Sequence, residues 1–94
     1  MLGKCACKSY CEENEDGDIY CYDVNGKLHS EEDRPAIISK LGGRMWFYHG
    51  KNDRDGDRPA IVHPDGRWYW AKAGKVYRIK DRKGRIVLEN NTNK

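Results

Sequence analysis

The sequence has no apolar run long enough to cross a membrane, and Lys4, Cys5 and Lys8 interrupt its first residues, where a signal peptide would need an apolar stretch. We therefore expect a cytoplasmic protein, whose thiols stay reduced. No segment shows a sustained apolar period of 3.6 residues, so we expect little helix. The chain also lacks a phosphate-binding glycine loop and a Ser-His-Asp arrangement, and these absences argue against an enzyme.

Apolar residues are scarce as well: 37% of the chain is hydrophobic and 35% is charged. A chain of 94 residues forms one domain at most and is marginally stable by itself. A metal, a partner or self-association would supply the missing stability. Three Trp, six Tyr and one Phe compensate in part, because each ring buries a large area.

Charge is distributed unevenly along the chain. Residues 1–33 hold nine acids against three lysines, a net charge of −6, whereas residues 34–94 hold fifteen Lys and Arg against six acids, a net charge of +9. Such an asymmetry steers a charged partner or favours head-to-tail association of copies. The alternative is a solvated surface with uneven ends.

Sequence landmarks recur at a spacing of 24 residues. The pentapeptide Asp-Arg-Pro-Ala-Ile occurs at 33–37 and 57–61, and Gly-Lys occurs at 26–27, 50–51 and 74–75. An aromatic residue precedes each Gly-Lys by four positions: Tyr22, Trp46 and Trp70. We interpret the chain, residues 1–94, as one domain with an N-terminal segment (1–21) and repeat units at 22–45, 46–69 and 70–93.

Each unit has the composition of β-structure. Runs of aromatic and β-branched residues alternate with turns of Gly, Asp and Asn, and the Asn25-Gly26 pair favours a tight hairpin turn. Because the 24-residue spacing is even, Tyr22, Trp46 and Trp70 should lie on one face of successive hairpins. The predicted fold is all-β: a small twisted antiparallel sheet of stacked 24-residue β-hairpins with a Cys-rich N-terminal knot.

The stretches NGKLHSEEDRPAIIS and GKNDRDGDRPAIVHPDGRWYW resemble a MORN-like repeat. The resemblance covers about residues 19–87, and Lys83-Gly84 in place of Pro-Ala marks the third unit as a terminal capping repeat. This family recurs in large bacteriophages, giant viruses and some bacteria. The resemblance implies arrays of β-hairpins that bind or scaffold other molecules, and it transfers no site residue.

All four cysteines lie in the first 21 residues, with the spacing C-x-C-x3-C-x9-C: Cys5, Cys7, Cys11 and Cys21. Four thiolates can hold Zn²⁺ tetrahedrally, and the metal would fasten the N-terminal segment to the first hairpin. The alternatives are free thiols or, if the protein leaves the cytosol, two disulfides.

Basic residues interleave with aromatic residues in 42–51 and 66–85. Rings can stack on unpaired bases while Arg and Lys hold phosphates. The residues predicted to bind a partner or nucleic acid are Arg44, Arg67, Trp68, Lys72 and Arg78. The alternative is that the rings form the core while the charges face water.

The three histidines, His29, His49 and His63, fall at different positions of the repeat, so we expect no ligand set from them. The stretch DRDGD at 53–57 lacks the length of an EF-hand loop and is interpreted as a repeat turn.

Together these features predict a non-enzymatic protein-binding module with a protein partner from a host cell. The resemblance suggests a small phage or mobile-element accessory protein that binds and inhibits a host complex. The alternative function is a zinc-containing protein that binds single-stranded nucleic acid. We expect no membrane partner, and self-association is compatible with either function.

Overall fold

A computed structural model describes residues 10–89, and the described chain is built of β-strands and turns without a helix. The strands pair antiparallel throughout, which confirms the predicted all-β class. The strands are β1 (Tyr10–Glu13), β2 (Ile19–Tyr22), β3 (Ile37–Ile38), β4 (Arg44–Met45), β5 (Phe47–Tyr48), β6 (Lys51–Asn52), β7 (Ile61–Val62), β8 (Trp68–Lys72), β9 (Lys75–Lys80) and β10 (Ile86–Glu89).

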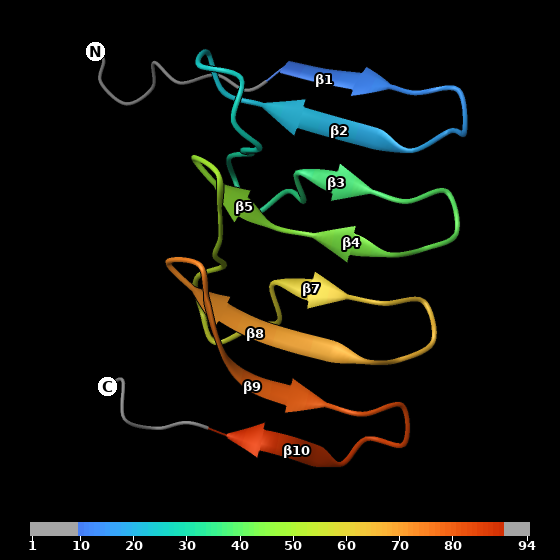
Figure 1. The fold of residues 1–94 in the computed structure, drawn as a ribbon, viewed down its shortest axis with the longest axis vertical. Coiled ribbons are helices and arrows are strands. Elements are labelled where there is room, and N and C mark those ends of the chain that lie inside the picture. Colours follow the sequence, from blue (N-terminus) through green and yellow to red (C-terminus); the bar gives the residue numbers. More distant parts are fainter. Residues whose placement is uncertain (1–9, 90–94) are drawn as a thin grey trace.

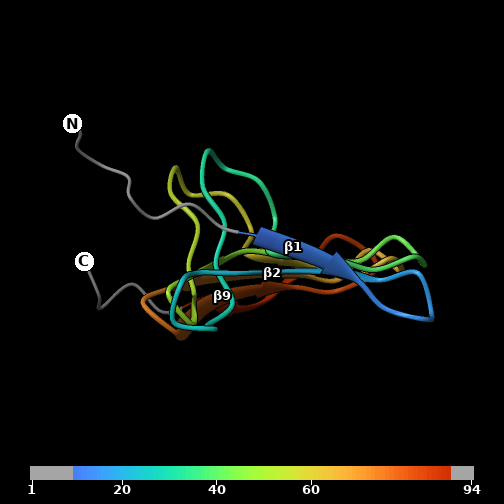
Figure 2. The same ribbon diagram turned by 90° about the horizontal axis from the view of Figure 1, so that it is seen from above.

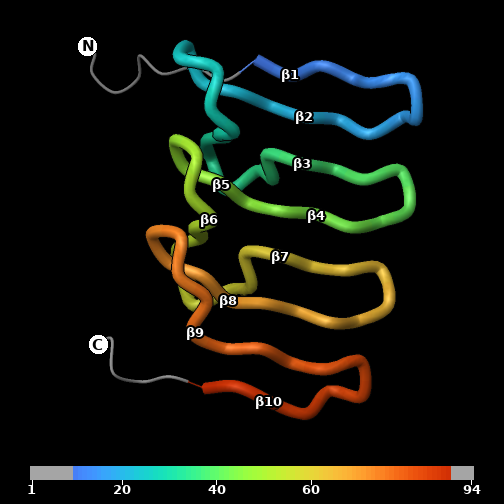
Figure 3. Tube along the Cα trace, in the orientation of Figure 1, coloured from blue at the N-terminus to red at the C-terminus, as the bar shows by residue number. Residues whose placement is uncertain are grey.

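Eight strands form one sheet in the order β1-β2-β3-β4-β7-β8-β9-β10, so spatial neighbours follow the chain (Figure 1). Strands β5 and β6 form a separate two-stranded ribbon at one end of that sheet (Figure 3). The main sheet consists of four hairpins: β1–β2, β3–β4, β7–β8 and β9–β10. The division into units at 22–45, 46–69 and 70–93 stays a prediction.

The four hairpins close with the same five-residue turn, at 14–18, 39–43, 63–67 and 81–85. In each turn the first residue donates its N–H to the fifth carbonyl, and the fourth residue donates back to the first carbonyl. The fourth residue is always glycine and has a positive φ, because a type I turn ends there in the left-handed region. The glycine spacing thus sets the hairpin ends, and all four turns lie at one end of the sheet (Figure 1).

The sheet is a single layer. The described residues extend 40 × 35 × 17 Å, and loops rise from one face near the end opposite the four turns (Figure 2). A small core lies at that end, where Trp46, Ala60 and Ala71 pack together. The buried apolar residues of the described chain are Cys21, Ala36, Trp46, Ala60, Trp70 and Ala71.

Trp46 and Trp70 share a face as predicted, but Tyr22 lies on the opposite face. The position equivalent to Trp46 is Cys21, because the Cys21 N–H donates to Ala36 O (2.7 Å) as the Trp46 N–H donates to Ala60 O (2.7 Å). Five residues, 23–27, connect Tyr22 to its partner Leu28, whereas four residues, 48–51, connect the equivalent partners Phe47 and Asn52. The longer first turn shifts the register and places Cys21, instead of Tyr22, in line with the tryptophans.

Candidate functional site

One face of the sheet carries a continuous apolar row that runs across seven neighbouring strands, β2 to β10. Consecutive members are cross-strand partners, so their side chains lie side by side on one face. None of them is buried, because the loops that rise beside Trp46 and Trp70 cover the other face. We call this row the open face; its members are Tyr20, Ile37, Met45, Ile61, Tyr69, Ile79 and Leu88.

The composition of the open face is that of an interface centre. The row contains two tyrosines, a methionine and four aliphatic residues, and no charged residue. Tyr and Met are enriched at the centres of protein interfaces, where charged residues are depleted. Further rings adjoin the row: the His63 and Tyr69 rings are 5.4 Å apart, and the Tyr10 and Tyr22 rings are 5.6 Å apart.

The five residues predicted to bind a partner do not gather into one patch. Arg44 and Trp68 lie on the face opposite the open face, on strands that flank β7, and Lys80 Nζ lies 3.5 Å from the Trp68 ring centroid. Arg67 lies in a hairpin turn, where its hydrogen bond lowers the pKa of Asp65.

Lys72 and Arg78 are both engaged by carboxylates. Lys72 Nζ contacts Asp55 (2.6 Å) and Asp53 (2.9 Å), and Arg78 contacts Glu89 (2.8 Å) and Asp57 (3.3 Å). These ion pairs neutralise the positive charges that would otherwise bind the phosphates of a nucleic acid. The predicted nucleic-acid platform therefore gains no continuous basic surface from these residues.

The recurring Asp-Arg-Pro-Ala segment builds a clamp around each tryptophan. Asp33 has a left-handed backbone (φ 59°); its carbonyl accepts from Trp46 Nε1 (3.0 Å), and its carboxylate accepts from Arg54 (2.9 Å). The Arg54 guanidinium lies 3.7 Å from the Trp46 ring centroid and lowers the pKa of Asp33. The clamp is thus a structural device, and the second copy consists of Asp57, Trp70 and Arg78.

His29 and His49 come together, although they stand at different positions of the repeat. Their rings stack at 4.0 Å, and the His49 N–H donates to His29 Nδ1 (2.9 Å). Since Nδ1 accepts, the proton of a neutral His29 ring lies on Nε2 and is donated to Glu31 Oε2 (2.6 Å). His49 Nδ1 pairs with Asp23 Oδ2 (2.6 Å).

The histidine cluster, formed by His29, His49 and Asp23, is buried at one end and exposed to solvent at the other. His29 and Asp23 are fully buried, whereas the His49 side chain is 41% exposed. The hydrogen bond from His49 lowers the pKa of Asp23 to about 2, and the backbone N–H groups of Lys27 and Asn25 contribute. His63 lies apart, beside Tyr69. Among residues 10–89 no group of three or more potential ligands is arranged to hold a metal ion.

A cleft of about 530 Å³ lies beside the first tryptophan clamp, between the loops at 30–34 and 53–58. Its charged side chains are largely paired with one another: Arg58 contacts Asp33 at 2.8 Å, and Lys72 contacts Asp55 at 2.6 Å. The cleft is therefore a polar depression between ion pairs.

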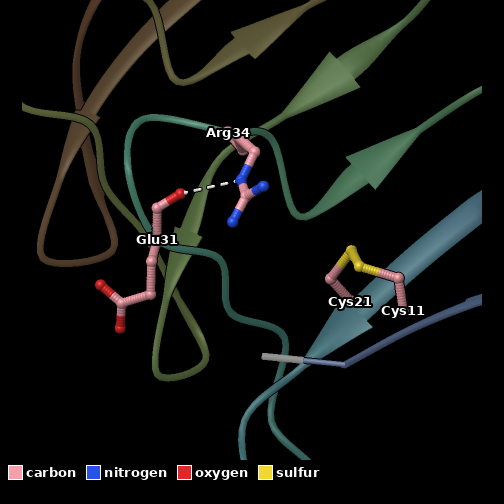
Figure 4. The surroundings of a disulfide bond; sticks show 4 residues. All are labelled: Cys11, Cys21, Glu31 and Arg34. Atoms are coloured by element: carbon pink, nitrogen blue, oxygen red, sulfur yellow. Dashed lines mark hydrogen bonds between the residues drawn. A yellow bond between two sulfur atoms is a disulfide. The ribbon is translucent and has the colours of Figure 1, made fainter. Parts of the chain in front are cut away.

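Cys11 and Cys21 form a disulfide between β1 and β2 (Figure 4). They face each other in the strand register, and the Cys21 N–H and C=O bond away from β1, so the two side chains are at a close pair position. Cys5 and Cys7 lie outside the described residues. In the disulfide form Cys11 and Cys21 are not thiolate ligands, so the four-cysteine zinc site stays a prediction for the reduced chain.

The disulfide also bears on location, because such bonds are typical of oxidising compartments. The cytoplasmic location therefore stays a prediction. The described residues include no helix able to span a membrane.

No family model, curated protein or solved structure matches this chain. The MORN-like assignment therefore remains a resemblance, and the function has to be argued from the geometry of the chain itself.

Proposed function

We propose that the protein is a non-enzymatic protein-binding module whose open face is covered by an uncharged, apolar surface of a partner protein. The observation that carries the proposal is the apolar row on seven neighbouring strands of a sheet without a second layer. A sheet is stable when its apolar face is buried against another layer. A partner would supply that layer.

The chemistry of the row defines the kind of partner. Charged residues are absent from it, so a strongly charged surface would lose hydration on docking without gaining ion pairs. Tyr20 and Tyr69 add hydroxyl groups that can bond to a polar rim. A flat protein surface with an apolar centre fits this face better than nucleic acid does.

The proposal can be tested with two adjacent residues of β4. A photo-crosslinking amino acid at Met45 reports from the open face, and the same amino acid at Arg44 reports from the opposite face. In the native host, we expect one recurring protein adduct from position 45 and little from position 44. Equal adducts from both positions would contradict the proposal, as would adducts with nucleic acid alone.

Once the adduct is identified, affinity gives the second test. Met45→Lys should weaken binding of the purified partner at least tenfold, because a lysine would desolvate an unpaired charge in the apolar row. Arg44→Lys is the matched control on the other face and should bind like the wild type. That the partner is a host complex and the protein of phage origin stays a proposal from resemblance alone.

A further inference from the structure

In the part of the chain that the structure describes, the two outer strands of the sheet, β1 and β10, have open edges. Within residues 10–89 each pairs with one neighbour, β2 and β9 respectively, and every residue in both strands is exposed. Ile86, Val87 and Leu88 of β10 are 49%, 60% and 43% exposed. Exposed strand edges are templates for pairing with another chain.

The hairpins that carry these edges close with the same turn but hold opposite charges. Asn14 Oδ1 accepts from the N–H groups two and four residues later, and Asp81 Oδ1 does the same. At the second, third and fifth turn positions the first turn has Glu15, Asp16 and Asp18, and the last turn has Arg82, Lys83 and Arg85. Acid therefore stands in one turn wherever base stands in the other.

The opposition extends over both hairpins. Residues 10–22 contain five acids and no base, a net charge of −5, whereas residues 75–89 contain six bases and two acids, a net charge of +4. Oppositely charged surfaces attract on approach and select the orientation of docking.

Neighbouring turns already touch within the molecule. Asp18 Oδ1 accepts from the Lys40 N–H (2.8 Å), which joins the first turn to the second, and Gly66 lies against the backbone of Arg82 in the last turn. If a hairpin from another chain added a ninth strand beside β10, the turn of that hairpin would make the same kind of contact with the turn at 81–85.

Strand direction is also correct for such an addition. The sheet has eight antiparallel strands, so β1 and β10 run in opposite directions (Figure 1). A second copy shifted along the sheet would set its β1 antiparallel to β10, with its acidic turn beside the basic turn at 81–85. Both edges would then gain backbone hydrogen bonds.

From these observations we propose that the chain associates head to tail, with β10 of one copy paired to β1 of a second copy. The contact joins two different surfaces, so it leaves one acidic and one basic edge free and extends into open chains. It uses the strand edges and turns, and it is independent of the partner proposed for the open face.

Sedimentation velocity of the full-length, disulfide-bonded protein provides the test. At low salt we expect the average mass to rise with protein concentration through dimer and longer species. At about 1 M salt, where the Debye length is about 3 Å, we expect mostly monomer. A protein that stays monomeric at all concentrations in low salt would overturn the proposal.

Charge reversal makes the test specific. Glu15→Lys with Asp16→Lys changes the net charge of the first turn, 14–18, from −3 to +1, and Arg82→Glu with Lys83→Glu changes that of the last turn, 81–85, from +2 to −2. Each double variant then has turns of the same sign at both ends and should be monomeric alone. All four side chains are in exposed turn residues, so circular dichroism should show the wild-type fold. An equimolar mixture of the two variants should associate like the wild type, because acidic and basic ends then alternate.

Two results would contradict edge pairing. One is a mixture that stays monomeric although the wild type associates. The other is association that survives both charge reversals but is lost in Met45→Lys, which would place the contact on the open face and leave the proposed function with a second copy as the partner.

Discussion

Two tight turns at the same end of the sheet have one backbone geometry and different chemistry. In the first junction, the turn Tyr48–Lys51, the Gly50 N–H donates to Leu28 O (2.7 Å), and the His49 N–H donates to His29 Nδ1 (2.9 Å). In the second junction, the turn Lys72–Lys75, the corresponding donors are Gly74 and Ala73, and the acceptors are Asn52 O (2.8 Å) and Asp53 Oδ2 (2.9 Å). Every pair of equivalent residues is separated by 24 positions.

The comparison shows that the fold requires an acceptor at this place and leaves its chemistry open. His49 (φ 48°) and Ala73 (φ 52°) both adopt the left-handed conformation of a two-residue type I′ turn. The acceptor is a fully buried neutral ring in the first junction, held by Glu31. In the second junction it is a carboxylate that is 20% exposed and paired with Lys72. A buried junction uses the neutral group because a buried charge is costly.

The tryptophan clamps beside the junctions give the largest expected effect. Trp46→Ala should destabilise the protein by about 3–5 kcal/mol, because it removes a buried ring that packs on Ala60, Ala71 and the Arg54 guanidinium. Urea denaturation followed by circular dichroism measures the loss. Trp46→Phe is the milder variant; it keeps a six-membered ring but loses part of the buried ring area and the hydrogen bond to Asp33 O, which alone is worth about 1 kcal/mol.

Trp70 tests whether the two clamps are equivalent. Trp70→Phe should cost about as much as Trp46→Phe, since both rings are buried and the Trp70 Nε1–H donates to Asp57 O at the same 3.0 Å. If Trp70→Phe lowered the free energy of unfolding severalfold more than Trp46→Phe does, the two clamps would not be equivalent in energy.

Substitution of the acceptors, His29 and Asp53, should lower the free energy of unfolding by less than Trp46→Ala does. The size of this loss should differ between the two junctions. His29→Ala leaves the His49 N–H without its acceptor and opens a cavity in a fully buried position, so we expect a loss of about 2–3 kcal/mol in the free energy of unfolding. Asp53→Ala should cost about 1 kcal/mol or less, because Ala73 is exposed and water can accept from its N–H.

An exchange of acceptors sharpens the same comparison. His29→Asp supplies the acceptor of the second junction but buries a carboxylate beside Glu31, so it should be at least as destabilising as His29→Ala. A variant as stable as the wild type in urea denaturation would show that burial does not select the neutral ring.

Several of these features could be predicted from the sequence, because they depend on local spacing. Glycine in the turns HPDGR and DVNGK marks chain reversals, and the equivalent spacing of Asp33 and Asp57 indicates the recurring clamp. His29 and Asp53 stand 24 residues apart, so the repeat spacing alone makes their positions equivalent, and the structure adds that both side chains are acceptors.

Other features depend on register, which spacing does not fix. The Gly-Lys pairs are evenly spaced, yet the segment between Tyr22 and Leu28 has one more residue than the segment between the equivalent Phe47 and Asn52. Cys21 therefore replaces Tyr22 in the buried row. The open face likewise requires six strand registers to be known at once. His49 was missed because its contact to His29 is made through its backbone N–H, and residue types do not predict such a contact.

The last expected difference between the junctions is in the pH dependence of stability, where the first junction responds to acid and the second to alkali. We expect this to be the smallest of the effects on global stability. In the first junction, the hydrogen bond from His49 lowers the pKa of Asp23 from 3.8 to about 2. The folded state therefore binds this proton less readily than the unfolded chain does. Its contribution to stability is complete above about pH 4 and is lost as the pH falls through about 2.

In the second junction, the carboxylates of Asp55 and Asp53 raise the pKa of Lys72 above its usual value of 10.5. This contribution is complete below about pH 10 and is lost only as the pH rises through the higher folded pKa. NMR titration of the Asp23 carboxyl and Lys72 Cε signals should show the first moving below pH 3.8 and the second above pH 10.5. Asp23→Asn should make only the acid limb of the stability curve less steep, since Asp33, Asp65 and Asp81 also contribute to that limb, and Lys72→Met should affect only the alkaline limb. If either substitution changed both limbs, the two junctions would be coupled, and their independence, on which the comparison rests, would be wrong.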